Sequence, residues 1–316
     1  MDAAGVRRRE VACVNFGAFQ LEPPDPPLRS PHMVVMLRPW VNVGNVGSIV
    51  LGRLNRTFDG QEVGRLVRPG TFYDFTRYRP EMKLVEGERV VTTPNTVIIA
   101  ARRETPPDLL LVHLLEPHAH SEDFNESVLQ VMSTLQVSAY VLVGGMYDSV
   151  PHSRPLVVTG SARGWDAAPN LGGVQLRRSS YEGPTSATNQ ISQQALGNGV
   201  RTLSLIVHLP MYLQLENDFT GAARLLEGIA PLYGLGLPPP ETEIGASQYA
   251  QVTPAVLKNP ELAELVARME RDYDSKPGDA PQGNVRLAPE IEKFLEDIRQ
   301  GGDRGGGADG AELPRE

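Results

Sequence analysis

The sequence of 316 residues contains a single cysteine, Cys13. One cysteine excludes an intramolecular disulfide framework and any metal site built from several thiolates. A reducing, cytoplasmic compartment fits this composition. The first ten residues are charged and no apolar stretch follows them, which is unlike a secretory signal. No apolar run approaches the roughly 20 residues of a membrane-spanning helix, so no membrane partner is expected.

Lysine is also scarce, and acidic residues outnumber basic residues by 38 to 30. The net charge of −8 lacks the basic footprint of a nucleic-acid-binding protein, so no nucleic-acid partner is expected. The sequence has no G-x-x-x-x-G-K-[ST] phosphate loop, and Gly44 and Gly47 do not have the G-x-G-x-x-G spacing. It also has no G-x-S-x-G nucleophile elbow. The sequence therefore predicts no cofactor and no catalytic residue.

A strand, a loop and a helix follow one another early in the chain. Residues 33–37 form a continuous apolar run, typical of a strand buried on both faces of a sheet. After a polar elbow with two glycines, apolar residues recur at helical spacing from residue 46 to residue 54. Open α/β sheets bind ligands beside such loops, although glycines here also serve turning and close helix packing. The candidate crevice residues at strand ends are Trp40, Asn42, Gly44, Asn45, Gly47, Tyr181, His208 and Tyr212.

Strands and helices alternate along the rest of the chain. Strands are predicted at residues 62–67, 109–115, 139–143 and 202–209, of which 109–115 is expected to be buried. Helices with one apolar face are predicted at residues 121–135 and 217–232, and a polar helix of small residues at 185–196. This alternation predicts an α/β fold, a three-layer α/β/α sandwich around a largely parallel or mixed sheet.

Three local features refine these predictions. Ser121 is the expected N-cap of the helix that follows it. The strand at residues 139–143 is expected to end at Gly144 and Gly145. Residues 88–93 and 96–101, separated by Pro94-Asn95, are typical of a β-hairpin.

Composition divides the chain into four parts. Residues 1–30 form a proline-rich, irregular lead-in, and residues 31–250 form the core domain. Residues 251–300 carry two appended amphipathic helices, the first of which starts at Asn259-Pro260. Residues 301–316 are glycine-rich and predict a disordered tail. The appended helices either dock on the core or reach a neighbouring subunit.

Two clusters of side chains have competing interpretations. His113, Glu116, His118, His120 and Asp123 offer metal-ligand chemistry, but two loop histidines do not define a ligand set, so no metal is predicted. His208 is either a base facing the crevice or a hydrogen-bonded structural histidine. The aromatic residues between positions 69 and 79 favour a satellite core cluster or a subunit contact over base stacking.

Several segments in order resemble one family. They include W-V-N-V-G-N-V-G-S at residues 40–48, F-Y-D-F at 72–75, Y-E-G-P at 181–184 and H-L-P-M-Y-L-Q at 208–214. Together they resemble the proteasome assembly chaperone family, type-2 group, over about residues 31–237. The helix after Asn259-Pro260 resembles the actinobacterial branch of that family.

The resemblance implies a nucleoside-phosphorylase-like α/β/α sandwich, self-assembly into homo-oligomers such as trimers, and no established catalytic residues. Eukaryotic relatives hold proteasome core α-subunits during ring assembly. Some relatives dock through a carboxyl-terminal hydrophobic-Tyr-any tripeptide, from which Pro314-Arg315-Glu316 departs. The leading hypothesis is a non-enzymatic binding or assembly protein whose partners are itself and proteasome core α-subunits. Its apolar surfaces would be residues 72–78 and the appended helices.

The alternative hypothesis is a small-molecule or nucleotide-binding enzyme. It would resemble either an ATP-dependent ligase or a nucleoside phosphorylase and would use the crevice at the carboxyl ends of the strands.

Overall fold

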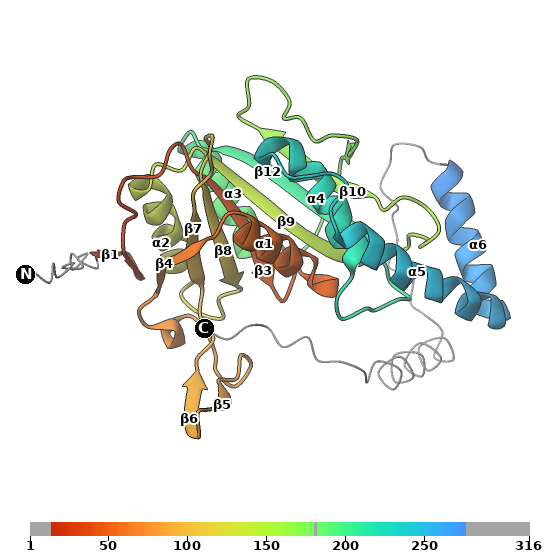
Figure 1. Ribbon diagram of the computed structural model, residues 1–316, viewed down its shortest axis with the longest axis horizontal. Coiled ribbons are helices and arrows are strands. Elements are labelled where there is room, and N and C mark those ends of the chain that lie inside the picture. The colour runs from red at the N-terminus through yellow and green to blue at the C-terminus, as the bar shows by residue number, and fades with distance from the viewer. Residues whose placement is uncertain (1–13, 180–181, 276–316) are drawn as a thin grey trace, which may run out of the picture.

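The computed structural model describes residues 14–179 and 182–275 of the chain (Figure 1). A sheet of ten strands runs through the molecule in the order β1-β2-β4-β7-β8-β3-β9-β12-β10-β11. Its four central strands, β8, β3, β9 and β12, are parallel, and the strands next to them, β7 and β10, are antiparallel. A mixed α/β sandwich was predicted, and the structure confirms it.

The central strands are the apolar segments of the sequence. They comprise β3 (His32–Arg38), β8 (Leu109–Leu115), β9 (Ala139–Asp148) and β12 (Arg201–Pro210). Both faces of these strands are covered, which explains why apolar residues occupy consecutive positions in them rather than strictly alternating with polar ones. The outer strands are β1 (Val14–Phe16), β2 (Phe19–Leu21), β4 (Gln61–Leu66), β7 (Val97–Ala101), β10 (Val158–Arg163) and β11 (Leu176–Arg177).

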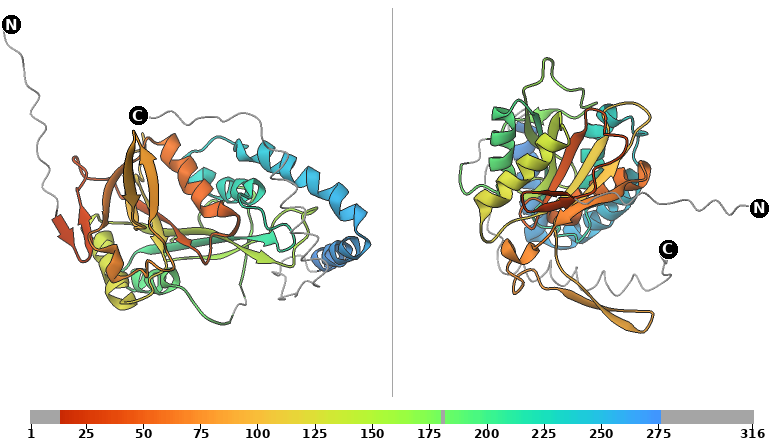
Figure 2. Two further views of the ribbon diagram at one scale, coloured as in Figure 1. Left: turned by 90° about the horizontal axis from the view of Figure 1, so that it is seen from below. Right: turned by 90° about the vertical axis from the view of Figure 1, so that its left-hand side faces the viewer.

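Two pairs of helices cover the two faces of the sheet (Figure 2). On one face α1 (Val46–Thr57) and α4 (Phe219–Tyr233) form one hydrophobic core with the strands. On the other face α2 (Ser121–Thr134) and α3 (Ala187–Gly197) form a second core. The three layers explain the helical apolar spacing predicted for each of these segments.

Two further helices follow the sandwich. Helix α5 (Glu241–Lys258), which the sequence analysis did not predict, packs on α4, and α6 (Pro260–Ser275) packs on α5. Asn259 caps α6 as predicted, since its Oδ1 accepts a hydrogen bond from the N–H of Leu262 at 3.1 Å. The second appended helix and the tail predicted after it lie outside the described residues.

A two-stranded hairpin, β5 (Glu81–Val85) and β6 (Glu88–Thr92), stands clear of the body in Figures 1 and 2. The predicted hairpin of residues 88–93 with 96–101 is wrong, because β6 pairs with β5 while β7 pairs with β4 and β8. The real turn is Glu86-Gly87, whose φ values of 52° and 87° suit a tight hairpin turn. Asn95 hydrogen-bonds the N–H and C=O of Leu66, which ties the supposed turn to β4 instead.

Two other local predictions are also wrong. His120, not Ser121, is the N-cap of α2, and Ser121 is the first helical residue. Strand β9 does not end at Gly144 and Gly145 but continues to Asp148. A Cβ at Gly144 would lie 2.2 Å from the carbonyl oxygen of Val41, so the glycine admits the elbow after β3 rather than ending the strand.

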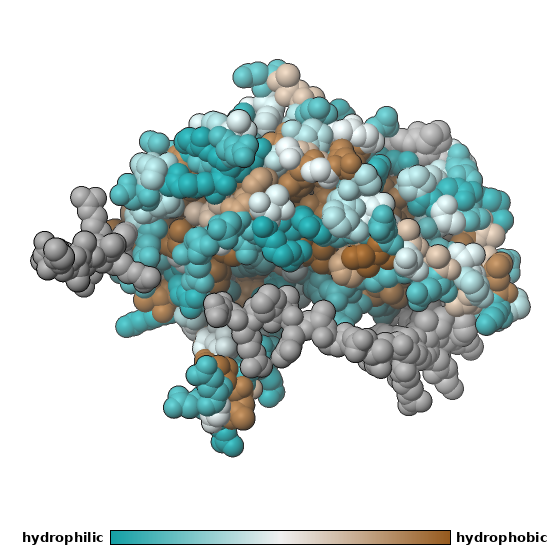
Figure 3. Space-filling model, viewed as in Figure 1, coloured by the Kyte–Doolittle hydropathy of each residue, from teal (hydrophilic) through white to brown (hydrophobic). Residues whose placement is uncertain are grey.

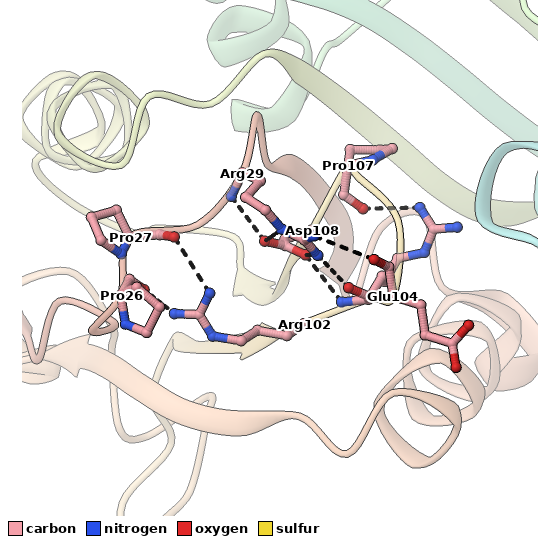
Figure 4. A network of polar contacts seen from close by, with 8 residues as sticks. Pro26, Pro27, Arg29, Arg102, Glu104, Pro107 and Asp108 are labelled. Carbon is pink, nitrogen blue, oxygen red and sulfur yellow. Dashed lines mark hydrogen bonds and ion pairs between the residues drawn. The ribbon is translucent and has the colours of Figure 1, made fainter.

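The proline-rich lead-in is fixed at the amino end of β8 by a network around Asp108 (Figure 4). The Asp108 carboxylate is fully buried and accepts hydrogen bonds from the Arg29 backbone and guanidinium and from the Arg103 N–H, at 2.8 to 3.1 Å. Burial by itself raises the pKa of Asp108, but these hydrogen bonds outweigh it and lower the pKa to about 2. Arg102 donates to the carbonyls of Pro26 and Pro27 and extends the network.

Candidate functional site

The elbow after β3 is held by hydrogen bonds among its own residues. Asn42 accepts from the Ser48 N–H at 3.1 Å and donates to Asn45 Oδ1 and Ser48 Oγ at 3.2 and 3.0 Å. A Cβ at Gly47 would lie 2.8 Å from the Cβ of Met36, so this glycine lets α1 start directly against β3. The amide group of Asn42 therefore stabilises the conformation of the elbow itself.

The remaining candidates of the elbow lie in different surroundings. Gly44 has a φ of 59° and packs against Leu209 and Asp218, below the surface. Trp40 is 69% exposed and projects from the loop. The predicted crevice residue Tyr181 lies outside the described residues. The crevice therefore stays a prediction, with Trp40 as its exposed side chain.

His208 belongs to a buried line of three polar side chains. Its Nδ1 lies 2.7 Å from Asp148 Oδ2, and its Nε2 lies 2.8 Å from Thr159 Oγ1. This order of carboxylate, imidazole and hydroxyl is that of a catalytic triad. The three residues are only 4–9% exposed, however, so a substrate would not reach the hydroxyl in this arrangement. These hydrogen bonds join β9, β12 and β10, so His208 acts as a hydrogen-bonded structural histidine in this arrangement.

Tyr212 is completely buried beneath the carboxyl-terminal helices. Its hydroxyl accepts a hydrogen bond from the His152 N–H at 2.8 Å, and its ring packs in a third apolar cluster with residues of α5 and α6. Leu262 and Met269 of α6 belong to this cluster and are 1% and 3% exposed. Of the two possibilities for the first appended helix, the structure therefore shows docking on the chain's own core.

The loop after β8 does not gather the predicted histidine cluster into a ligand set. His113 is half-buried in β8, and loss of solvation together with the nearby Arg38 lowers its pKa to about 4. Glu116 Oε1 accepts the N–H of Ala187 at 3.0 Å, at the start of α3, and burial raises its pKa. Across residues 14–179 and 182–275, no group of three or more His, Cys, Asp and Glu side chains is arranged to hold a metal.

A shallow pocket lies where the hairpin leaves the body. Its volume is about 340 Å³, and it is lined by residues 70–74, Arg77 and residues 118–119. We call it the root pocket. Phe72 and Tyr73 are among its lining residues, are only 4% and 2% exposed, and pack against Phe124 of α2. The aromatic segment is thus a core cluster, and its two central rings are not free to cover a partner.

The hairpin exposes most of the apolar surface that lies near this pocket. Every residue from 79 to 93 is exposed, and Figure 3 shows apolar side chains along the hairpin. The cross-strand pair Met82 and Val91 shares one face with Leu84, and these side chains are 62%, 55% and 72% exposed. The sequence analysis missed this face because it assigned β6 to the wrong partner. The signal was Glu86-Gly87 between two short apolar strands.

The described part of the chain has no helix that is both long enough and apolar enough to cross a membrane. Comparison with family models matches residues 36–256 to the PAC2 family, more than half of the chain. The chain belongs to the PAC2 family. The resemblance found in the sequence motifs is therefore confirmed. The matched range includes all the candidate crevice residues, from Trp40 to Tyr212.

Solved PAC2-like structures share the fold. A PAC2 family protein from Streptomyces avermitilis is 27% identical, with a TM-score of 0.65 over 75% of this chain and 99% of its own. Rv2714 from Mycobacterium tuberculosis, of unknown function, is 26% identical, with a TM-score of 0.70 over 84% of this chain and 92% of its own. Rv2125 from M. tuberculosis, a proteasome-assembly chaperone homologue, is 21% identical, with a TM-score of 0.65 over 74% and 99%. Comparison with curated proteins finds no match.

Proposed function

We propose that this chain is a non-enzymatic assembly protein that binds proteasome core α-subunits in the cytoplasm and associates with copies of itself. The observation that carries the proposal is membership of the PAC2 family across residues 36–256. A structural relative from M. tuberculosis bears the description of a proteasome-assembly chaperone homologue. Binding, rather than catalysis, is the task for which the exposed apolar hairpin is suited.

The mechanism is surface complementarity, in which apolar side chains lose contact with water on a partner and polar groups around them set the register. Two surfaces expected to do this are occupied by the chain itself, since Phe72 and Tyr73 lie in the core and α6 docks on its own chain. Among the described residues, open apolar surfaces include the β5–β6 hairpin, Trp40 and the outer face of α5, where Leu257 is 73% exposed.

The direct test uses purified full-length chain on a biosensor surface and the separately purified proteasome core α- and β-subunits of the source organism. We expect saturable binding of the α-subunits with a Kd of micromolar or below, and at least tenfold weaker binding of the β-subunits. The proposal fails if α-subunits bind no better than β-subunits. Sedimentation of the chain alone measures the self-association separately.

A further inference from the structure

Within residues 14–179 and 182–275, the β5–β6 hairpin pairs with no other strand and belongs to none of the three hydrophobic clusters. It forms a separate two-stranded sheet, and its residues from 79 to 93 are exposed throughout. An isolated two-stranded hairpin is only marginally stable in water, because it has neither a packed face nor neighbouring strands. Three exposed apolar side chains on one face add to this cost. We call residues 79–93 the arm. Its exposed apolar face is typical of a surface that a binding partner covers.

Charge distinguishes the two ends of the arm. The tip carries Glu86 and Glu88, and neither forms an ion pair within the described residues. Arg89 follows at the tip but lies opposite Leu84, on the apolar face. Lys83, midway along the arm, is already paired with Glu81 at 3.4 Å. The tip thus presents two unpaired carboxylates to whatever it meets.

The root of the arm is basic. Arg77 is 72% exposed and has only a long ion pair with Asp74, at 3.8 Å. Arg79 and Arg38 are exposed, and neither has an ion-pair partner in the described ranges. Arg38 lies close enough to Tyr78 and His113 to affect the pKa of each. Arg77 lines the root pocket together with Asp74, and Arg79 follows two residues later at the start of the arm.

We propose that the arm docks on a second copy of this chain, with its acidic tip at the basic root of the other copy's arm. This deepens the self-association part of the proposed function and rests on it. Both halves of the contact are present on one chain: two carboxylates at the tip, with no ion pair in the described residues, and the exposed guanidinium groups of Arg77 and Arg79 at the root, of which Arg77 has only the long ion pair with Asp74. No other protein is needed to supply the complementary charge.

The length of the arm allows the contact to form along its whole apolar face. A strand of five residues spans about 17 Å, so a second arm laid antiparallel places each tip at the opposite root. Met82, Leu84 and Val91 of each copy then face the other copy and leave water. In a dimer with two-fold symmetry, both tip–root contacts form between the same two copies. In a ring, the tip of each copy contacts one neighbour and its root contacts the other neighbour.

The first experiment is sedimentation of the full chain with Met82→Asp, Leu84→Asp and Val91→Asp together. These side chains are exposed, so the body keeps its circular dichroism and melting temperature. We expect the dissociation constant of self-association to rise at least about a hundredfold, so that the 34.4 kDa monomer predominates. Leu237→Asp is the control, since it places a charge at a 57% exposed position in the loop between α4 and α5 and leaves the mass unchanged.

The second experiment reverses the charges. Glu86→Arg with Glu88→Arg is expected to weaken self-association, as is Arg77→Glu with Arg79→Glu. A chain carrying all four changes, or a mixture of the two double variants, regains it, because tip and root then match again.

Three other outcomes would overturn the proposal, and each contradicts a different part of it. If the wild type associates but the arm variants associate equally well, the arm is not the contact, while self-association stands. If the wild type is a monomer at all concentrations, self-association itself fails. If the arm variants instead lose binding to α-subunits, the arm meets that partner and not a second copy.

Discussion

Replacing Asp108 by alanine is expected to lower the free energy of unfolding more than replacing an exposed loop carboxylate by alanine. The Asp108 side chain is fully buried and accepts two backbone N–H groups, of Arg29 and Arg103, besides the Arg29 guanidinium. Each backbone donor left without an acceptor costs about 1–3 kcal/mol. Two such donors give a loss of about 3–4 kcal/mol, which for a domain of this size lowers the melting temperature by about 6–16 °C.

The assay is thermal unfolding of Asp108→Ala and Asp108→Asn at pH 7, supported by urea titrations. Asparagine keeps the shape and one acceptor oxygen, so its effect should be the smaller of the two. Asp74→Ala is the control, because that carboxylate also accepts a backbone N–H, from Thr76, but is exposed. A melting temperature for Asp108→Ala within 2 °C of wild type would refute the reasoning.

The same network predicts a pH dependence. The folded-state pKa of about 2 lies below the unfolded value of about 3.9. The stabilisation is therefore complete above pH 4 and is lost as the pH falls from 4 toward 2. The difference in unfolding free energy between wild type and Asp108→Asn should shrink across that interval and stay constant from pH 5 to pH 7.

Four further outcomes are expected. Met269→Asp should release α6 and increase hydrogen exchange around Tyr212 without changing the mass in light scattering, since Met269 is buried within its own chain; a lower assembly state would contradict this. Gly47→Ala should destabilise by about 1–3 kcal/mol in urea titrations, because its Cβ would meet Met36. Burial and nearby arginines lower the pKa of His32 to about 4, so stability should fall from pH 6.5 to 4, and less steeply in His32→Gln. Nucleotides, with or without Mg²⁺, should leave the melting temperature unchanged; a reproducible rise above 2 °C would favour the enzyme hypothesis.

The centre of the fold was predictable because its signal is local. Strands β3, β8 and β12 are rich in apolar residues, and the helices that cover them repeat apolar residues at helical spacing. Helix α5 was missed because its pattern is weak: it is rich in polar and small residues, contains Pro254, and buries few side chains. Its position is set by packing on α4, which no local pattern encodes.

The polar contacts of the candidate site were not predictable, because they join residues far apart in the chain. Asp148 and His208 lie 60 positions apart and meet only because β9 and β12 are neighbours in register. His152 and Tyr212 meet in the same way, across the end of that strand pair. Motif spacing singled out His208 and Tyr212 as residues of interest, but their partners depend on the strand order.

The position of β3 in the sheet has a consequence for synthesis of the protein. This early strand lies in the centre, between β8 and β9, so its two edges are completed by segments that leave the ribosome much later. About a hundred residues separate β3 from its β9 partners, which at 5–20 residues per second is roughly 5–20 s. During that interval the edge of β3 that will pair with β9 stays open, although Met33–Leu37 is entirely apolar. A protein proposed to assist the assembly of others is itself exposed to misassociation until its ninth strand has emerged.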